Sequence, residues 1–274
     1  MEKDTKKVGN LKLIALRKKL TKLTDKMIEL YSTPDTIFEL MTMRGYLNED
    51  GYYDELMYNT LQEVGVFKVD SYSDLKLVAK LLDSDAYDTE FYELAGFESG
   101  GIYLYQGRYI IPIRDIQGEV IAWVGWYPDN RKYVTSTTYG FAKAAYFFNM
   151  ECFSECWKKN DGVVFLVEGI FDTLALRSLG FSAIGQMGAD MSPVKTDMLY
   201  RYNKVIAIND NDVVGQQTSI YSGYARADKI WRLPKNSCTI KLPEGVKDAD
   251  DLIKEYDCYE ELKSCYNRVG YYKL

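Results

Sequence analysis

Two short, uninterrupted apolar runs dominate the hydrophobic pattern of the second half of the chain, Val163–Val167 and Val205–Ile208. Each run is long enough for a strand that is buried on both faces, and too short for a helix between turn signals. Runs of this kind are typical of the inner strands of a parallel sheet, because helices cover both of its faces.

The segment between these runs predicts the elements that connect them. Phe171 to Leu179 has helical spacing and is followed by Gly180, a typical C-cap, and Phe181 to Gly185 is a third apolar run. Ser192-Pro193 has the form of an N-cap followed by proline at the first helical position. The order strand, helix, strand, helix, strand predicts right-handed crossovers and an α/β domain with a parallel sheet.

Acidic residues follow both apolar runs directly. Glu168 comes after the first run, and Asp210 and Asp212 come after the second. Because the carboxyl ends of parallel strands meet at one edge, we expect these carboxylates to lie close together there. Close carboxylates repel one another unless a cation lies between them, and carboxylates are common ligands of Mg²⁺ and Mn²⁺. The alternative is that these acids only cap helices.

The first 33 residues predict a basic amphipathic helix. An apolar seam with spacings of three and four runs along it, formed by Leu13, Leu16, Leu20, Leu23, Met27 and Leu30. Residues 1–26 carry nine Lys or Arg and three acids, a net charge of +6 that leaves −12 for the rest of a chain whose total is −6. Such a helix either reaches nucleic acid or a partner protein, or packs its leucines on its own domain.

Residues 34–98 read as helical scaffold, with helices expected over Thr36–Arg44, Asp54–Val64 and Leu75–Leu82.

The chain has 274 residues, of which 47% are hydrophobic, enough for the cores of one or two domains. It contains neither an apolar stretch of eighteen residues nor a signal-peptide pattern, which predicts a soluble, cytoplasmic protein without membrane contact. Five cysteines without paired spacing, and no histidine, favour reduced thiols over a structural zinc site.

The acidic motifs resemble a known domain. Glu168-Gly169-x-x-Asp172 and Asp210-Asn211-Asp212-x-x-Gly215 are similar to the two signature motifs of the Toprim domain, which bacterial-type primases, topoisomerases and several nucleases share. The segment Lys247–Leu252, with Asp248 and Asp250, resembles the third acidic segment of primases. Acids in a first helical turn also favour the macrodipole without any metal, so both readings of this segment stay open.

Basic motifs before the Toprim motifs indicate which group of Toprim proteins the chain resembles. Residues 107–122 resemble the strand, turn and strand that open the primase RNA polymerase core, and residues 131–133 and 141–149 resemble its later basic motifs. Over residues 85–265 the chain therefore resembles the catalytic core of DnaG-type primases of bacteria and phages. The resemblance implies an α/β fold, in which a mixed α+β basic subdomain precedes a Toprim parallel sheet flanked by helices. The expected parts are a basic N-terminal helix over 1–33, the α+β subdomain over 34–150, the Toprim domain over 160–253 and a helical tail over 254–274.

The function implied by the resemblance is synthesis of short RNA primers on single-stranded DNA from ribonucleoside triphosphates, by nucleotidyl transfer that needs Mg²⁺ or Mn²⁺. Its catalytic residues would be Glu168, Asp210 and Asp212, and Asp172, Asp248 and Asp250 would join them around the metal. The nucleotide and the template would contact four basic residues, Arg108, Arg114, Lys132 and Lys143.

Some features depart from the family. Trp126 stands where an arginine is usual, and Asn211 and Val213 replace residues common in the second acidic motif, a divergence that suits a phage or mobile-element enzyme. We expect the zinc-binding and helicase-docking domains to be missing, so that a replicative helicase or a separate zinc-binding protein would act as partner. A Toprim nuclease and a catalytically weak binding module remain the alternatives. The basic motifs argue for a primase, and the intact acidic motifs argue for catalysis.

Overall fold

The computed structural model forms two compact units, Met1–Phe141 and Ala142–Leu274. The residues that the structure describes are 2–47, 54–83, 87–97, 105–128, 133–188, 191–211, 234, 237–268 and 270–274. Asp212 and Lys132, two residues singled out from the sequence, lie outside these ranges. None of the helices within these ranges has the length and apolar character that crossing a membrane requires.

Among its described residues, the first unit has five α-helices: α1 (Glu2–Tyr31), α2 (Pro34–Arg44), α3 (Glu55–Val64), α4 (Tyr72–Asp83) and α5 (Thr89–Ala95). The three helices expected within residues 34–98 are confirmed as α2, α3 and α4. Their boundaries follow from capping. The Asp54 carboxylate accepts hydrogen bonds from the first-turn amides of α3, and Gly65 ends that helix in the left-handed conformation at φ 78°. Gly45 ends α2 in the same way, at φ 74°.

The sheet of the first unit is antiparallel, with the order β1-β2-β3-β4. Its strands are β1 (Phe67–Lys68), β2 (Tyr109–Arg114), β3 (Val120–Trp126) and β4 (Tyr133–Thr135). The turn between β2 and β3 is shaped by Asp115, whose Oδ1 accepts from the amides of Gln117 and Glu119, and by Gly118 at φ 83°. The expected strand, turn and strand over residues 107–122 are therefore present.

Helix α1 packs on this sheet through its apolar seam. Leu16, Leu20, Leu23 and Met27 are buried in one core with Trp123 of β3. Of the two readings of the basic helix, the structure confirms the one in which its leucines pack on their own domain. The ends of the seam are more open, since Leu30 is 41% exposed.

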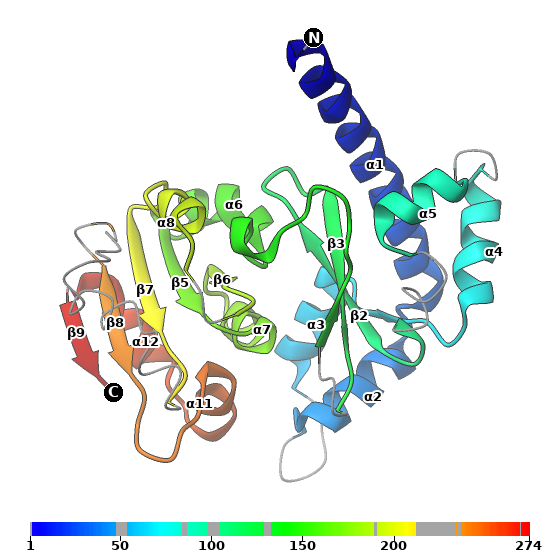
Figure 1. Ribbon diagram of the computed structural model, residues 1–274. Coiled ribbons are helices and arrows are strands. Elements are labelled where there is room, and N and C mark those ends of the chain that lie inside the picture. Colours follow the sequence, from blue (N-terminus) through cyan, green and yellow to red (C-terminus); the bar gives the residue numbers. More distant parts are fainter. Residues whose placement is uncertain are drawn as a thin grey trace. The chain divides into compact units, whose positions relative to one another are not determined.

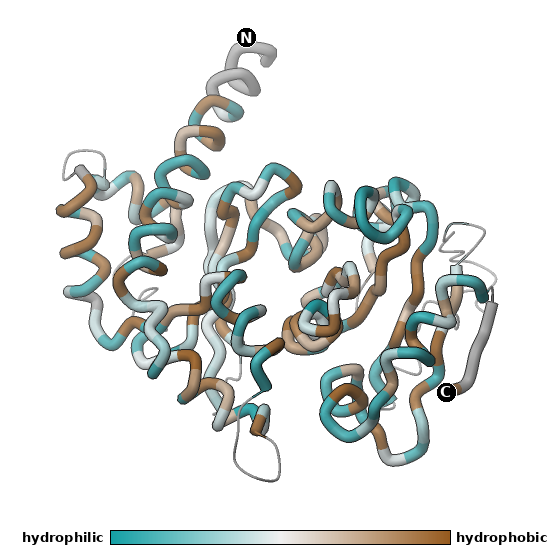
Figure 2. The backbone as a smooth tube through the Cα atoms, turned by 180° about the vertical axis from the view of Figure 1, so that it is seen from behind, coloured by the Kyte–Doolittle hydropathy of each residue, from teal (hydrophilic) through white to brown (hydrophobic). Residues whose placement is uncertain are grey.

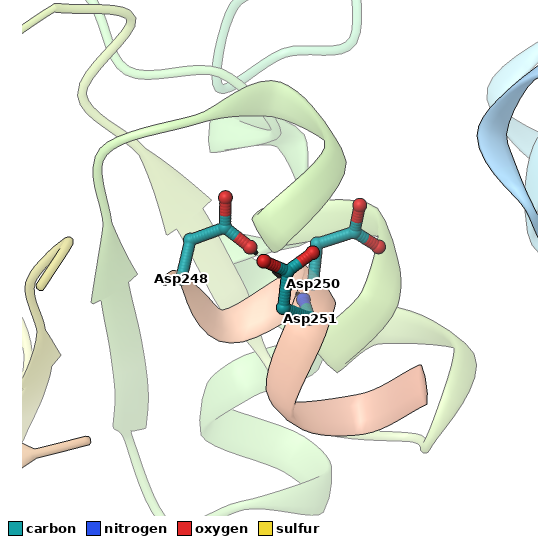
Figure 3. Close-up of side chains that lie close together, drawn as sticks. All are labelled: Asp248, Asp250 and Asp251. Atoms are coloured by element: carbon teal, nitrogen blue, oxygen red, sulfur yellow. Dashed lines mark hydrogen bonds between the residues drawn. The ribbon is translucent and has the colours of Figure 1, made fainter. Parts of the chain in front are cut away.

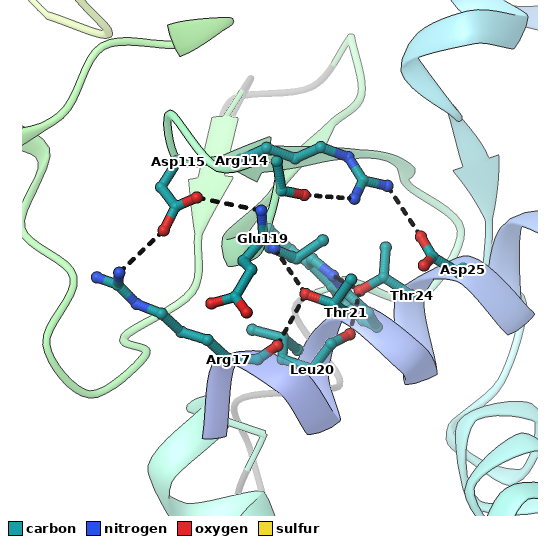
Figure 4. A network of polar contacts seen from close by, with 11 residues as sticks. Arg17, Leu20, Thr21, Thr24, Asp25, Arg114, Asp115 and Glu119 are labelled. Atoms are coloured by element: carbon teal, nitrogen blue, oxygen red, sulfur yellow. Dashed lines mark hydrogen bonds and ion pairs between the residues drawn. The ribbon is translucent and has the colours of Figure 1, made fainter. Parts of the chain in front are cut away.

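A polar network fixes α1 against the β2–β3 hairpin (Figure 4). Arg17 pairs with Asp115 at 3.0 Å, and Arg114 pairs with Asp25 at 3.0 Å. Between these ion pairs, the Trp123 indole donates to Thr24 Oγ1 at 2.8 Å in a fully buried contact. The network sets the register of the helix along the hairpin.

The second unit contains a parallel sheet with the order β6-β5-β7-β8-β9. Its strands are β5 (Val163–Val167), β6 (Ala183–Gly185), β7 (Lys204–Ile208), β8 (Cys238–Lys241) and β9 (Gly270–Lys273). The crossover helices are α7 (Ile170–Ser178) and α8 (Pro193–Leu199), and Ser192 caps α8 as expected. The predicted α/β class, a parallel sheet flanked by helices after a mixed α+β unit, is confirmed.

Helices cover both faces of this sheet (Figure 1). Side chains of β5 point alternately to the two faces, so that Phe165 packs in one core with α7, α11 (Ala249–Glu255) and α12 (Tyr259–Ser264). Leu166 packs in the other core, with α6 (Phe153–Lys159) and α8. In Figure 2 the hydrophobic colour runs along the inner strands of this sheet, whereas α1 alternates between hydrophobic and hydrophilic colour. Burial on both faces explains why β5 is apolar at every position.

Candidate active site

The candidate site lies where β5 and β7 end, at the carboxyl edge of the parallel sheet. The two strands are direct neighbours, with Leu166 opposite Ala207, so the residues that follow them lie side by side. Glu168 follows β5 and Asp210 follows β7, and both are half-buried. The backbone amide of Asn211 donates to the Lys247 carbonyl at 2.6 Å, which brings the third acidic segment to the same edge.

Glu168 is held in place through its backbone by the loop after β6. The Met187 amide donates to the Glu168 carbonyl at 3.0 Å, and the Gln186 amide donates to the Val167 carbonyl at 2.9 Å. The Gln186 carbonyl in turn accepts from the ammonium of Lys195, whose side chain is 1% exposed and whose Nζ lies 5.2 Å from the centroid of an aromatic ring, that of Phe147. Sequence reasoning missed Lys195, because a lysine in a short helix gives no sign of burial.

The junction from β5 to α7 requires a glycine. A Cβ on Gly169 would lie 2.1 Å from Asp172 Oδ2, so only glycine leaves room for this carboxylate. Asp172 occupies the first turn of α7, where an acid is favoured by the helix dipole, and it is 6% exposed. The spacing Glu-Gly-x-x-Asp thus has a packing reason.

Helix α11 brings the third acidic segment to Asp172. The backbone amide of Asp250 donates to Asp172 Oδ1 at 3.0 Å. Asp248 caps α11 by accepting from the Asp251 amide at 2.9 Å. Carboxylate oxygens of Asp248, Asp250 and Asp251 all lie within 4.8 Å of one another (Figure 3). This segment therefore both caps a helix and belongs to an acidic cluster.

The electrostatics of the cluster favour a cation. Burial, followed by the nearby charges of Asp248 and Asp210, raises the pKa of Asp172 to about 8. Two lysines compensate part of the negative charge of these carboxylates. Lys247 pairs with Asp248 at 2.7 Å, and Lys254 pairs with Asp250 at 2.8 Å. The pKa of Lys247 is raised, and the main cause is its hydrogen bond to Asp248.

Oxygen donors of this kind fit Mg²⁺ or Mn²⁺, which prefer one or two carboxylates and keep other positions for water or phosphate. Asp210, Asp248 and Asp172 are the carboxylates whose charges the structure brings together. Asp250 is 1% exposed, and its carboxylate pairs with Lys254 at 2.8 Å. Sequence reasoning did not single out Lys247 as a partner of the cluster, although it directly precedes Asp248.

The basic residues singled out from the sequence have different surroundings. In the first unit, Arg108 is buried at the start of β2, whereas the Arg114 guanidinium, at the end of β2, contacts Asp25 and the Gly118 carbonyl. The structure thus gives Arg114 a role in holding α1. Lys143, in the second unit, is exposed on a short 3₁₀ turn, Lys143–Ala145.

Comparison with known proteins agrees with this geometry. Residues 165–253 match the family model described as Toprim-like. The DNA primase of Rickettsia felis is 27% identical over 254 residues, which are 86% of this chain and 42% of that protein. The solved zinc-binding and RNA polymerase domains of the Aquifex aeolicus primase superpose with a TM-score of 0.69 at 24% identity, covering 92% of this chain and 61% of that one.

The chain has the fold of a DnaG-type primase catalytic core. A solved DnaG primase catalytic domain bound to single-stranded DNA has the same fold, with a TM-score of 0.65 at 20% identity over 91% of this chain and 78% of that one. The chain spans less than half the length of the curated primases that it matches. The residues that match the Toprim-like family model include the whole acidic cluster described above.

Proposed function

We propose that this chain is the catalytic core of a DNA primase, which joins ribonucleotides into short primers on a single-stranded DNA template. The observation that carries the proposal is the gathering of the three acidic segments at the carboxyl edge of the sheet, through the pairing of β5 with β7, the contact between Asn211 and Lys247, and the hydrogen bond from the Asp250 amide to Asp172. Known DNA primases are its relatives in sequence, and the fold is shared with a primase domain that was solved with single-stranded DNA.

In the proposed reaction, the 3′ hydroxyl oxygen of the growing primer bonds to the α-phosphorus of the incoming ribonucleoside triphosphate. The bond from that phosphorus to the pyrophosphate oxygen breaks at the same time. Asp210 and Asp248 would hold Mg²⁺ or Mn²⁺, with Asp212 as a further ligand predicted from the sequence. Such an ion, when bound, lowers the pKa of the attacking hydroxyl and stabilises the leaving pyrophosphate.

The residues of the chain have separate tasks in this scheme. The Glu168 carboxylate takes the proton of the attacking hydroxyl, or binds the metal as a ligand. Asp172 keeps α11 in place through the Asp250 amide, and so positions Asp248. Lys143, together with Lys132, would bind the phosphates of the nucleotide or template.

The direct test is primer synthesis by the purified chain on mixed-sequence single-stranded DNA, with labelled ribonucleotides and Mg²⁺ or Mn²⁺. We expect short RNA products from the wild type and none from Asp210→Asn. A matched control is Asp257→Asn, which removes an exposed carboxylate of the same unit outside the cluster and should leave synthesis intact. Shortening of the template without primers would favour the nuclease alternative.

A second readout does not depend on catalysis. Mn²⁺ should raise the thermal unfolding midpoint of the wild type, since a ligand that binds only the folded state stabilises it. The rise should be smaller in Asp210→Asn and unchanged in Asp257→Asn. An equal rise in all three proteins would place metal binding elsewhere and remove the basis of the proposal.

A further inference from the structure

A polar pocket of about 360 Å³ lies at one end of the antiparallel sheet of the first unit. It is formed by the end of β1, the turn before β2, the residue after β3 and one side chain of α2. The lining residues are Glu39, Lys68, Asp70, Gln106, Gly107, Arg108 and Tyr127.

The backbone around this pocket is held firmly. The Gly107 amide donates to the Val69 carbonyl at 2.8 Å, and the Arg108 amide donates to the Tyr105 carbonyl at 3.0 Å. Gly107 adopts φ 70°, a conformation that favours glycine in this turn. The pocket therefore has a fixed floor between β1 and β2.

Arg108 is built into the wall of the pocket. Its side chain lies against Gly125 of β3, where a Cβ would come within 3.2 Å of Arg108 Cδ. Glycine at this position leaves the space that the arginine stem occupies. Arg108 is 9% exposed although it lines an open pocket, so packing constrains most of its side chain.

The charges of the lining balance. Lys68 Nζ contacts both carboxylate oxygens of Glu39, at 2.8 and 3.1 Å, and lies 5.3 Å from the centroid of the Tyr109 ring. The second set of opposite charges consists of Arg108 and the exposed carboxylate of Asp70. Tyr127, which is 36% exposed, adds an aromatic face, and Gln106 adds an amide.

This lining disfavours both a phosphate and an apolar ligand. A phosphate would meet two carboxylates in addition to the two cations, and an apolar ligand would leave charged groups without compensation. A flat, neutral ligand with donors and acceptors on its edges suits the pocket better. Such a ligand can lie on the Tyr127 ring, donate to Asp70 and accept from Arg108.

We propose that this pocket binds a nucleobase, and that guanine fits it best. Guanine carries two neighbouring N–H donors that match a carboxylate, and its O6 and N7 acceptors match an arginine. This inference rests on the proposed function. If the chain is a primase, the base would come from the template or from an incoming nucleotide. The nucleobase contacts would belong to Asp70, Arg108 and Tyr127.

The test is a ligand-observed NMR titration of the full chain with guanosine, adenosine, cytidine and uridine, without a divalent metal. Guanosine should bind most tightly. Asp70→Asn should weaken guanosine binding about tenfold, the usual effect of losing a charged hydrogen-bond partner, and remove the preference for guanosine. Tyr127→Ala should weaken the binding of all four nucleosides.

Two exposed residues of the same unit, outside the pocket, provide matched controls. Glu93→Gln and Tyr139→Ala should leave guanosine binding unchanged. The proposal is overturned if guanosine does not bind at about 10 mM, or if Asp70→Asn binds it as well as the wild type does. Displacement of guanosine by equimolar inorganic phosphate would also overturn it, in favour of an anion site.

The outcome is separable from that of primer synthesis. Nucleoside binding requires neither metal nor the acidic cluster of the second unit. Guanosine binding that depends on Asp70 would support the pocket even if the chain makes no primers. Primers made by a chain that binds no guanosine would refute the pocket and leave the proposed function standing.

Discussion

The backbone amide of Asp250 donates a hydrogen bond to Asp172 Oδ1 across 3.0 Å, although the two residues are 78 positions apart. Asp172 belongs to the first turn of α7 and Asp250 to the first turn of α11, so one carboxylate lies at the positive ends of two helices. This contact joins the first acidic motif to the third. It also gives Asp172 a structural task besides any contact with a metal.

The raised pKa of Asp172 predicts a stability that depends on pH. The folded protein keeps this proton up to about pH 8, whereas an unfolded aspartate releases it near pH 4. As the pH rises from about 4 to 8, ionisation therefore costs the folded state stability, and Asp172→Asn escapes this cost while keeping an oxygen for the Asp250 amide.

In EDTA, we expect Asp172→Asn to unfold at a higher temperature than the wild type at pH 8, with a gain that shrinks toward pH 4. Thermal unfolding at several pH values measures this gain. A difference that stays the same at all pH values would contradict the assigned pKa.

Replacement of Gly169 by alanine should disturb the acidic cluster. The new Cβ would lie 2.1 Å from Asp172 Oδ2, so the carboxylate has to move away from the Asp250 amide. We expect a loss of about 1–3 kcal/mol in the free energy of unfolding, as for a broken buried hydrogen bond. Urea unfolding measures it. Gly9 lies within α1, and a Cβ added there would lie 3.9 Å from the nearest atom. Gly9→Ala should therefore be neutral or slightly stabilising.

The hydrogen bond between Thr24 and Trp123 should contribute measurably to stability. Thr24→Val keeps the shape of the side chain but leaves the buried indole N–H without its acceptor, at a cost of about 1–3 kcal/mol. Thr42→Val is the matched control, because Thr42 makes the same hydrogen bond to a carbonyl four residues earlier in an exposed position. If both variants unfold at the same urea concentration as the wild type, the indole contact is unimportant.

Two of the ion pairs that α1 makes, Arg17 with Asp115 and Lys12 with Glu90, should differ in strength according to their burial. Asp115 is 4% exposed as a residue, so Arg17→Met leaves a buried carboxylate without its cation and should cost about 2–4 kcal/mol. Lys12 and Glu90 form a pair whose side chains are 58% and 59% exposed, so solvent screens it and Lys12→Met should leave stability essentially unchanged. Equal effects, measured by urea unfolding, would refute this ranking.

Much of the second unit could be predicted from the sequence, but its last strand could not, because Gly270–Lys273 forms β9 within residues 254–274, which were expected to be a helical tail. Val163–Val167 is apolar at every position because helices bury both faces of β5, and the capping pattern at Ser192 depends only on local geometry. The two-residue strand β1 is too short to show a hydrophobic pattern in the sequence. It is a strand only because it pairs with β2.

Contacts between distant residues were the main features that the sequence could not reveal. The spacing of the leucines in α1 predicts a helix, but whether a partner covers them depends on Trp123, about a hundred positions later. Arg114 looks like any exposed basic residue until the fold brings it to Asp25, 89 positions earlier. Its contact with nucleic acid stays a prediction, as do the metal ligands Asp210 and Asp248.

The packing of α1 on the β2–β3 hairpin also affects how the protein is made. The contact between Thr24 and Trp123 joins residues 99 positions apart, and the ribosome adds about 5–20 residues per second. The leucine seam of α1 therefore leaves the ribosome about 5–20 s before the hairpin that covers it. During that interval the nascent chain carries an uncovered apolar helix, and so presents a binding segment to chaperones early in its synthesis.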